Sequence, residues 1–499
     1  MSVLRADLHQ LSEEIKGYAL EYGLDFIPVN FELVDYRQMN QIAACSGFPT
    51  RYPHWSFGME FEQLIKGHTY GLRKIYEMVI NNNPSYAFLL LGNTMVDHKT
   101  VMAHVFAHSD FFKNNLWFSK TNRKMIDEMA NHATRVHRYI EKHGFQKVEN
   151  FLDTCLSIEN LIDPHSPFIV RERVTDQDSE DQEAPVVVKR IQSKEYMTDY
   201  VNPPEFLERQ KKLLEESRKR KKRFPQNLTQ DILKFMLENS PLENWQRDIL
   251  SIVREESYYF VPQRQTKIMN EGWATYWHSK IMTERCLTDA DVIDYADHHS
   301  GTLFTQPGRL NPYKLGVELY RHIEERWNKG RFGKEYDDCE DLREKANWDR
   351  RLNQGREKIF EVRKFCNDVT FIDTYMTEEF CREHKLFAYE YNPKTGQYLI
   401  TERGFRTIKA KLLFQLTNFG LPFIFVEDGN YRNRGELLLR HRYDGVELHW
   451  NYAKDTLRNL YKLWKRPVNL ATVIHGKGKI VTFDGEEFQE SETRAHQVA

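Results

Sequence analysis

The segment VMAHVFAHSDFF, residues 101–112, constrains the fold most, because it is apolar on nearly every side yet carries two histidines. At 3.6 residues per turn, His104 and His108 lie one above the other on one helix face. Asp97 is the expected cap of this helix. A helix that is apolar all round is a buried helix, and buried imidazoles need hydrogen-bond partners or a bound cation. A pair of hydrogen-bonded core histidines and half of a metal site are therefore both open interpretations.

A second segment of the same kind, KIMNEGWATYWHSKIM, carries Glu271 and His278 two helical turns apart. A buried carboxylate without a partner is costly or protonated. One arrangement would give partners to the buried polar groups of both segments. In it, Glu271 approaches His104 and His108 and completes a metal site, with zinc as the expected ion. His278, about 10.5 Å further along the axis, is expected nearby as a proton donor or oxyanion stabiliser, or as a fourth ligand if the helix is distorted. Three protein ligands with an open position are typical of catalytic zinc.

The general base of such a centre stays open. In H-E-x-x-H metalloproteases the base is the glutamate after the first histidine, and Val105 stands at that position here. The carboxylates that could replace it are Glu255, Glu256, Asp110, or Glu271 itself if His278 becomes a ligand.

Two loop-like segments offer possible substrate contacts. The segment QPGRLNPYKLG contains Arg309 and Tyr313, which could hold an anionic or carbonyl group. The segment YPHWSFG contains His54 and Trp55. A packing role is the alternative for each, because turns rich in proline and aromatic residues often serve packing.

Hydrophobic periodicity predicts a mainly α-helical chain, with one large domain over residues 1–390. Residues 395–490 alternate between apolar and polar around Gly-, Asn- and Asp-rich turns, with one helix at 451–465, and predict a small α+β domain that could serve as an interaction module. A charged insert near 175–225 contains TDQDSEDQEAP and ends in the basic run SRKRKKRFP. We expect a solvated or disordered segment there, with an anionic partner as the alternative.

Composition excludes several classes of protein. The 499 residues carry a formal net charge of −2, which does not favour nucleic acid as a partner. No apolar run approaches the roughly 18 residues that span a bilayer, and the amino-terminal residues lack the apolar core of a secretory signal. Six scattered cysteines without a C-x-x-C pair indicate reduced thiols. The expectation is a cytoplasmic protein without membrane insertion.

Four motifs together carry a resemblance to a known family. In order and spacing, they resemble the stage V sporulation protein R (SpoVR) family of bacteria: YPHWSFG (52–58), VMAHVFAHSDFFKNN (101–115), MNEGWATYWH (269–278) and NPYKLG (311–316). The resemblance covers residues 5–485 and implies a role in sporulation, in forming the peptidoglycan of the spore cortex, although members also occur in bacteria that do not sporulate. It also implies partners, since members are often encoded beside a serine protein kinase and a von Willebrand A-like protein.

A two-histidine helix followed by an E-G-W-A helix is also similar, more distantly, to gluzincin metallopeptidases. That similarity implies a zincin-like helical domain and assigns His104, His108 and Glu271 as zinc ligands. The departure is Val105, where gluzincins carry the base, so peptidase activity does not carry over.

Two functions follow as expectations. The first is a metal-dependent hydrolase of amide or peptide bonds, linked to cell-wall material, with His278, Glu256, Arg309 and Tyr313 as candidate catalytic residues. The second is a non-catalytic regulatory or scaffold protein that works with the kinase and the von Willebrand A-like protein.

Overall fold

The computed structural model describes residues 4–69, 77–169, 197, 203–221, 224–306, 309–393 and 395–493. The predicted acidic stretch at 175–185 and the basic side chains up to residue 223 lie outside the described part. The chain divides into two compact units. Unit 1 is Met1–Val148 with Tyr258–Leu421, and unit 2 is Glu149–Ser257 with Pro422–Ala499. The elements are mostly helices, and a five-stranded sheet lies after residue 422, so the predicted fold class is confirmed.

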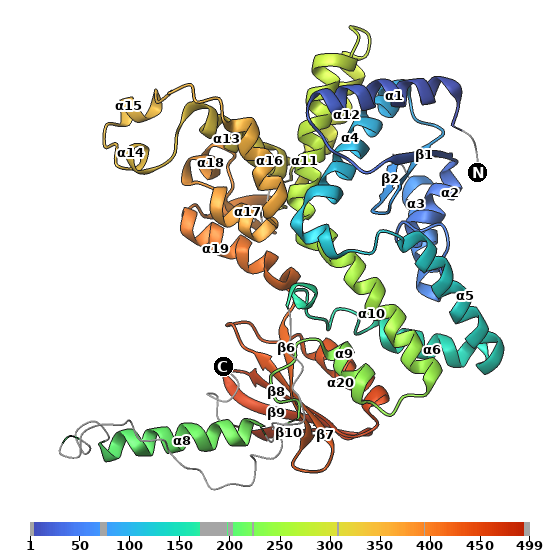
Figure 1. Ribbon diagram of the computed structural model, residues 1–499, viewed down its shortest axis with the longest axis vertical. Helices are drawn as coiled ribbons and strands as arrows, with labels where there is room; N and C mark the ends of the chain where they lie inside the picture. The colour runs from blue at the N-terminus through green and yellow to red at the C-terminus, as the bar shows by residue number, and fades with distance from the viewer. Residues whose placement is uncertain are drawn as a thin grey trace. The chain divides into compact units, whose positions relative to one another are not determined.

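Unit 1 consists mainly of helices from two distant segments (Figure 1). The first segment holds α1 (Ala6–Glu21), β1 (Val29–Val34), α2 (Tyr36–Ala44), α3 (Trp55–Thr69), β2 (Glu77–Ile80), β3 (Ser85–Leu90), α4 (Met95–Asn114), η1 (Leu116–Lys120) and α5 (Met125–His143). The second holds α11 (Lys267–Ile281), η5 (Met282–Cys286), α12 (Val292–Leu303), α13 (Pro312–Lys329), α14 (Lys334–Asp337), α15 (Leu342–Ala346), α16 (Gly355–Phe365), α17 (Asp368–Tyr375), α18 (Glu378–Glu383), β4 (Ala388–Asn392), β5 (Gln397–Glu402), α19 (Phe405–Leu416) and η6 (Thr417–Gly420).

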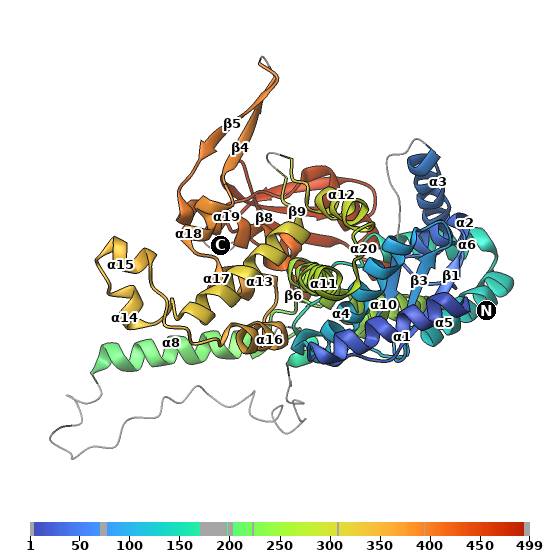
Figure 2. The same cartoon turned by 90° about the horizontal axis from the view of Figure 1, so that it is seen from above.

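The first segment also contains a three-stranded sheet of order β1-β3-β2, which the helical periodicity of residues 1–165 did not predict. The strand β1 pairs in parallel with β3, and β2 pairs antiparallel with β3. These strands are only four to six residues long, and a short apolar run fits a buried helix or a strand equally well. In the second segment, Figure 2 shows the β4–β5 hairpin projecting beyond α18 and α19.

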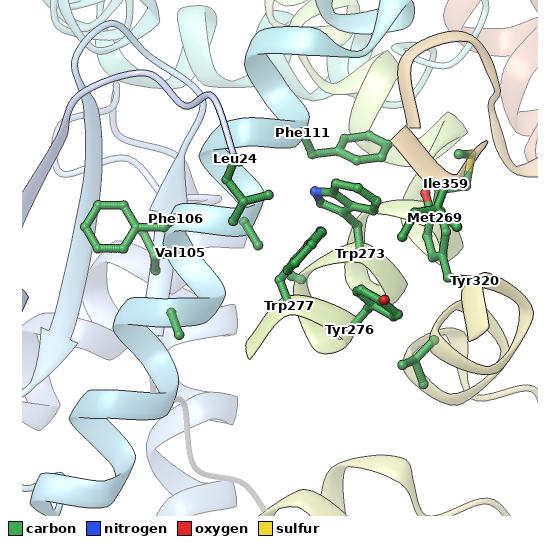
Figure 3. Packing of buried hydrophobic residues seen from close by; sticks show 14 of the residues in the cluster. Leu24, Val105, Phe106, Phe111, Met269, Trp273, Tyr276, Trp277, Tyr320 and Ile359 are labelled. Atoms are coloured by element: carbon green, nitrogen blue, oxygen red, sulfur yellow. The ribbon is translucent and has the colours of Figure 1, made fainter. Parts of the chain in front are cut away.

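The core of unit 1 lies where α4 and α11 pack together, as the apolar character of both helices predicts (Figure 3). The indole of Trp273 meets that of Trp277 edge-to-face at 5.5 Å and tilts against Tyr320 of α13 at 5.3 Å. All three side chains are fully buried. The centre of unit 1 is therefore a dense aromatic layer, which fixes how α11 sits between α4 and α13.

Two glycines let α11 and α13 touch through their backbones. A Cβ added to Gly272 would lie less than 3.0 Å from the backbone of Gly316, and one added to Gly316 would lie less than 3.0 Å from the carbonyl of Ile268. Neither position tolerates a side chain without separating the helices. This close approach of the two backbones explains why glycine stands in the EGWA segment and in the YKLG segment.

Unit 2 combines helices with a five-stranded sheet of order β10-β9-β8-β7-β6 (Figure 1). Its elements are η2 (Ser166–Phe168), α8 (Pro204–Lys221), α9 (Ile232–Asn239), β6 (Phe423–Tyr431), β7 (Glu436–Arg442), α20 (Trp450–Trp464), β8 (Val468–Ile474), β9 (Lys477–Phe483) and β10 (Phe488–Glu492), while α6 (Phe145–Leu156) and α10 (Asn244–Gln265) cross the unit boundary. The helix predicted at 451–465 is confirmed as α20, and the strands β8 and β9 that follow it form an antiparallel pair. The mostly polar residues Phe488–Glu492 form the edge strand β10, which pairs antiparallel with β9.

The two segments of unit 2 are joined by side-chain and backbone contacts. The ring of Phe235 on α9 stacks on Trp464 of α20 at 5.6 Å, and Thr229 bridges to Val426 of β6. Along the described ranges, none of the helices combines the length and the apolar character that crossing a bilayer requires.

Candidate metal centre

Helix α4 presents both histidines to the interior. It begins at Thr94, whose side chain accepts a hydrogen bond from the backbone of Asp97, while the Asp97 carboxylate accepts from Thr94 in return. The prediction of Asp97 as the N-cap is therefore wrong. The N-cap is Thr94, and Asp97 is the N3 residue of a capping box with it. His104 and His108 are buried, with 6% and 5% of their surfaces exposed.

Helix α11 takes its amino-terminal cap from a distant part of the chain. Its own N-cap residue, Thr266, makes no side-chain hydrogen bond to the helix. Instead, the carboxylate of Asp368 on α17 accepts from the backbone of Ile268 and Met269, each at 2.9 Å. Asp368 thereby holds the first turn of the helix that carries Glu271.

Replacing Asp368 with alanine should lower the free energy of unfolding by about 1–2 kcal/mol, the usual value of a helix cap. Burial raises the pKa of Asp368 from 3.8 to about 7, against the opposing effect of its backbone hydrogen bonds. Between these values the native state keeps a proton that the unfolded state has lost, so stability falls as the pH rises through this window. Urea unfolding across the window should show this slope in the parent and a flatter slope in Asp368→Asn. The control variant is Asp373→Asn, which changes an exposed carboxylate of the same helix.

Three acceptor atoms converge between α4 and α11. The Nε2 atoms of His104 and His108 lie 2.9 Å apart, and the Oε2 atom of Glu271 lies 3.6 Å from the first and 3.5 Å from the second. The point equidistant from all three atoms is about 1.9 Å from each, close to the roughly 2.0–2.1 Å that zinc keeps from nitrogen and oxygen ligands. The triangle therefore has the dimensions of a three-ligand metal site.

The other nitrogen of each imidazole has its own partner. The Nδ1 atom of His108 lies 2.9 Å from the side-chain oxygen of Asn270, so this nitrogen carries the proton and Nε2 keeps its lone pair toward the point of convergence. The Nδ1 atom of His104 lies 2.9 Å from Nδ1 of His278. Partners of this kind orient metal-binding histidines and fix their tautomers.

The electrostatics of Glu271 favour a cation at the point of convergence. Its Oε2 atom is buried and has no hydrogen-bond partner among the described residues, which is costly unless a positive ion is bound. A proton on His104 or His108 would place positive charge 3.5–3.6 Å from this oxygen, whereas a metal ion at the equidistant point would contact all three atoms at once. Burial by itself would raise the pKa of Glu271, but the two imidazoles and the ammonium of Lys267 hold it well below its ordinary value. The carboxylate is therefore charged.

His278 lies beside the centre, in contact with the outer nitrogen of His104 and not with the converging atoms. Its Nε2 atom lies 3.4 Å from Nδ1 of His299 on α12. Burial, together with the neighbouring histidines, lowers the pKa of His278 well below its ordinary value, so the imidazole is neutral. This position is that of an orienting partner.

The more exposed side of the centre is bordered by Lys267 and Tyr313. The ammonium of Lys267, whose side chain is 56% exposed, pairs with Glu271 and lies 5.8 Å from the centre of the Tyr313 ring. That ring stacks 6.4 Å from the ring of His104. Of the two residues predicted in the segment after Gln306, the structure therefore brings Tyr313 to the centre and leaves Arg309 exposed.

Sequence reasoning missed Lys267 and Asn270. Both lie in the segment that was singled out, and Lys267 stands four residues before Glu271, the spacing at which charges pair on a helix. Asp368 gave no such signal, because its partners are backbone groups of a helix a hundred residues earlier.

The remaining predicted bases differ in their surroundings. The Asp110 carboxylate accepts hydrogen bonds from Arg363 and from the indole of Trp273, all at 2.8 Å, and so serves the core. Glu256 is buried on the unit 2 part of α10, Glu255 is exposed there, and a role for either stays a prediction. His54 is buried and contacts Ser56, while Trp55 is exposed.

Fold and site together define a largely helical protein with a buried centre of two histidines and one glutamate. The family model described as SpoVR like protein matches residues 3–421, and the model of the SpoVR-like C-terminal domain matches residues 422–475. The chain belongs to the SpoVR family. It is 30% identical over 483 residues to "Uncharacterized protein YcgB" of Escherichia coli (strain K12), covering 90% of this chain and 89% of that protein. No solved structure matches the chain.

Proposed function

We propose that the chain is a metal-dependent hydrolase of amide or peptide bonds, with zinc or another divalent ion held by His104, His108 and Glu271. The observation that carries this proposal is the convergence of two Nε2 atoms with a buried carboxylate oxygen that lacks a hydrogen-bond partner among the described residues. When bound, such an ion acts as a Lewis acid on a carbonyl. The family name, which points to sporulation, supports cytoplasmic cell-wall precursors or peptidoglycan fragments as substrates.

The residues around the centre have distinct roles in this proposal. Asn270 and His278 hold the two imidazoles in place through their outer nitrogens. Lys267 and Tyr313 border the more exposed side, where a substrate would approach. The Tyr313 hydroxyl is a group that can give a proton to the leaving amine, and Lys267 can hold an anionic part of the substrate.

Metal analysis of the purified full-length protein tests the first step. We expect about one divalent ion per chain in the parent, and loss of that ion in His104→Ala and in Glu271→Gln, because a three-ligand site fails when one ligand is removed. The control is His9→Ala, which removes an exposed histidine of α1 and should leave metal content unchanged. A parent without bound metal, or equal metal in all variants, would contradict the proposal.

Hydrolysis tests the second step. Peptidoglycan fragments and small amides, incubated with metal-loaded protein, should be cleaved, and Tyr313→Phe should slow cleavage by about a hundredfold while leaving metal content intact.

A regulatory or scaffold role is the second candidate, and the burial of Val105 favours it. This residue stands where gluzincins place the base, and it is fully buried in the core. Bound metal without hydrolysis, together with a stable complex between the full chain and the serine protein kinase or the von Willebrand A-like protein, would support this role over the first.

A further inference from the structure

Unit 1 contains a cavity apart from the metal centre. It has a volume of about 430 Å³ and lies between the start of α13, the segment from α18 to β4, and helix α19. None of the three predicted metal ligands lines it. The volume falls within the range of roughly 300–1,000 Å³ that is usual for small-molecule sites.

Positive charge dominates the lining of this cavity. Four cationic side chains, those of Arg309, Lys314, Lys385 and Lys411, come to it from three separate stretches of chain. The carboxylate of Glu318 also lines it, but pairs with Arg321 at 3.1 Å. Within the described ranges, no acidic side chain pairs with any of the four cations. All four side chains are exposed, so solvent screens their mutual repulsion in part, and together they give this cavity a positive potential that attracts an anion.

The cavity also has an apolar side. Leu310, Phe387 and Leu412 line it with side chains that are exposed or half-buried and can contact a ligand. Leu315, Phe380 and Ile408 also line it, but they are 4%, 0% and 7% exposed and belong to the core. The ring of His384, another lining residue, lies 4.4 Å from the ring of Phe380. A ligand that fills this space therefore needs an apolar or aromatic body in addition to its charged group.

We propose that this cavity binds an organic phosphate, with the phosphate held by the four cations and the apolar body set against Leu310, Phe387 and Leu412. A carboxylate brings one negative charge, whereas a phosphomonoester brings almost two and three acceptor oxygens, which suits a lining of one arginine and three lysines better. The site does not depend on the metal centre, although Lys314 directly follows Tyr313 on α13.

Titration calorimetry on the full chain tests this site with 1-naphthyl phosphate, 1-naphthoate, 1-naphthol and inorganic phosphate as probes. We expect naphthyl phosphate to bind about tenfold tighter than naphthoate or inorganic phosphate. The difference in affinity between naphthyl phosphate and the neutral naphthol should be larger than tenfold. Lys314→Gln and Lys411→Gln should each weaken it by about tenfold, the effect of one charge-assisted hydrogen bond. The control is Lys364→Gln, which removes an exposed charge of α16 outside the cavity.

Several outcomes would overturn the proposal. Absence of binding at millimolar naphthyl phosphate would do so, and so would equal affinity for naphthol, or unchanged affinity in both lysine variants. Equal affinity for naphthoate would overturn the assignment to phosphate. His104→Ala should keep parent affinity for naphthyl phosphate, so failure at the metal centre and failure at this cavity are told apart.

Discussion

Replacing Gly316 with alanine should destabilise unit 1 by about 3 kcal/mol or more, because the new methyl group meets backbone and not a side chain that can move. Gly272→Ala should have an effect of similar size from the opposite helix. Either change forces α11 away from α13 and displaces Glu271, the neighbour of Gly272, from the two histidines. Denaturant unfolding and metal content, measured on the same preparations, should fall together.

The matched control is Gly17→Ala, because Gly17 lies inside helix α1 and nothing lies within 4 Å of an added methyl group. Alanine favours the helix there by roughly 0.5–1 kcal/mol, so this variant should be unchanged or slightly more stable. An unaltered midpoint in Gly316→Ala would show that the two helices can separate without cost, and would contradict the close-packing argument.

Replacing Arg363 with methionine should cost about 3–5 kcal/mol, since it leaves the Asp110 carboxylate buried without its cation. The carboxylate is 0% exposed and joins α4 to α16 through Arg363 and to α11 through Trp273. Burial raises the pKa of Asp110 to about 6 even though Arg363 opposes the shift, so without Arg363 it should rise further. The loss should therefore be larger at pH 8 than at pH 5, where the carboxyl can take up a proton.

Arg382→Met is the control for this pair. Arg382 and Glu378 form an ion pair with side chains 76% and 58% exposed, and exposed pairs add at most about 1 kcal/mol. Adding Asp110→Asn to Arg363→Met should recover part of the stability in urea unfolding, since it removes the stranded charge. Failure of the double variant to recover any stability would assign the loss to packing instead.

Much of the fold could be predicted because α4 and α11 are apolar on nearly all sides, and helices of this kind are buried in the core. The α+β character of the carboxyl-terminal region also followed from alternation between turns. The strands β1 to β3 could not be predicted, because they are only four to six residues long and β1 pairs with β3 across 56 positions of sequence, although β2 and β3 are neighbours. Strand β10 was missed because it is polar and is held by its pairing with β9 and not by burial.

The candidate site was predictable only where its residues stand out against their own helix. His104, His108 and Glu271 do so, and the structure brings their side chains together, while metal binding itself stays a prediction. His278 also stands out, but its place behind His104 depends on the crossing of two helices. Residues that act through backbone contacts, such as Asp368 and the paired glycines, carry no local signal, because their partners come from other segments.

Because unit 1 is assembled from two stretches of chain with part of unit 2 between them, its centre has an order of completion during synthesis. The histidines of α4 leave the ribosome first and must wait, without their carboxylate, until the whole intervening stretch has been translated and α11 emerges. A nascent chain halted before Lys267 would thus expose the apolar side chains of an incomplete core. Such a chain is prone to aggregate, so binding by a chaperone would protect it until the later helices are translated.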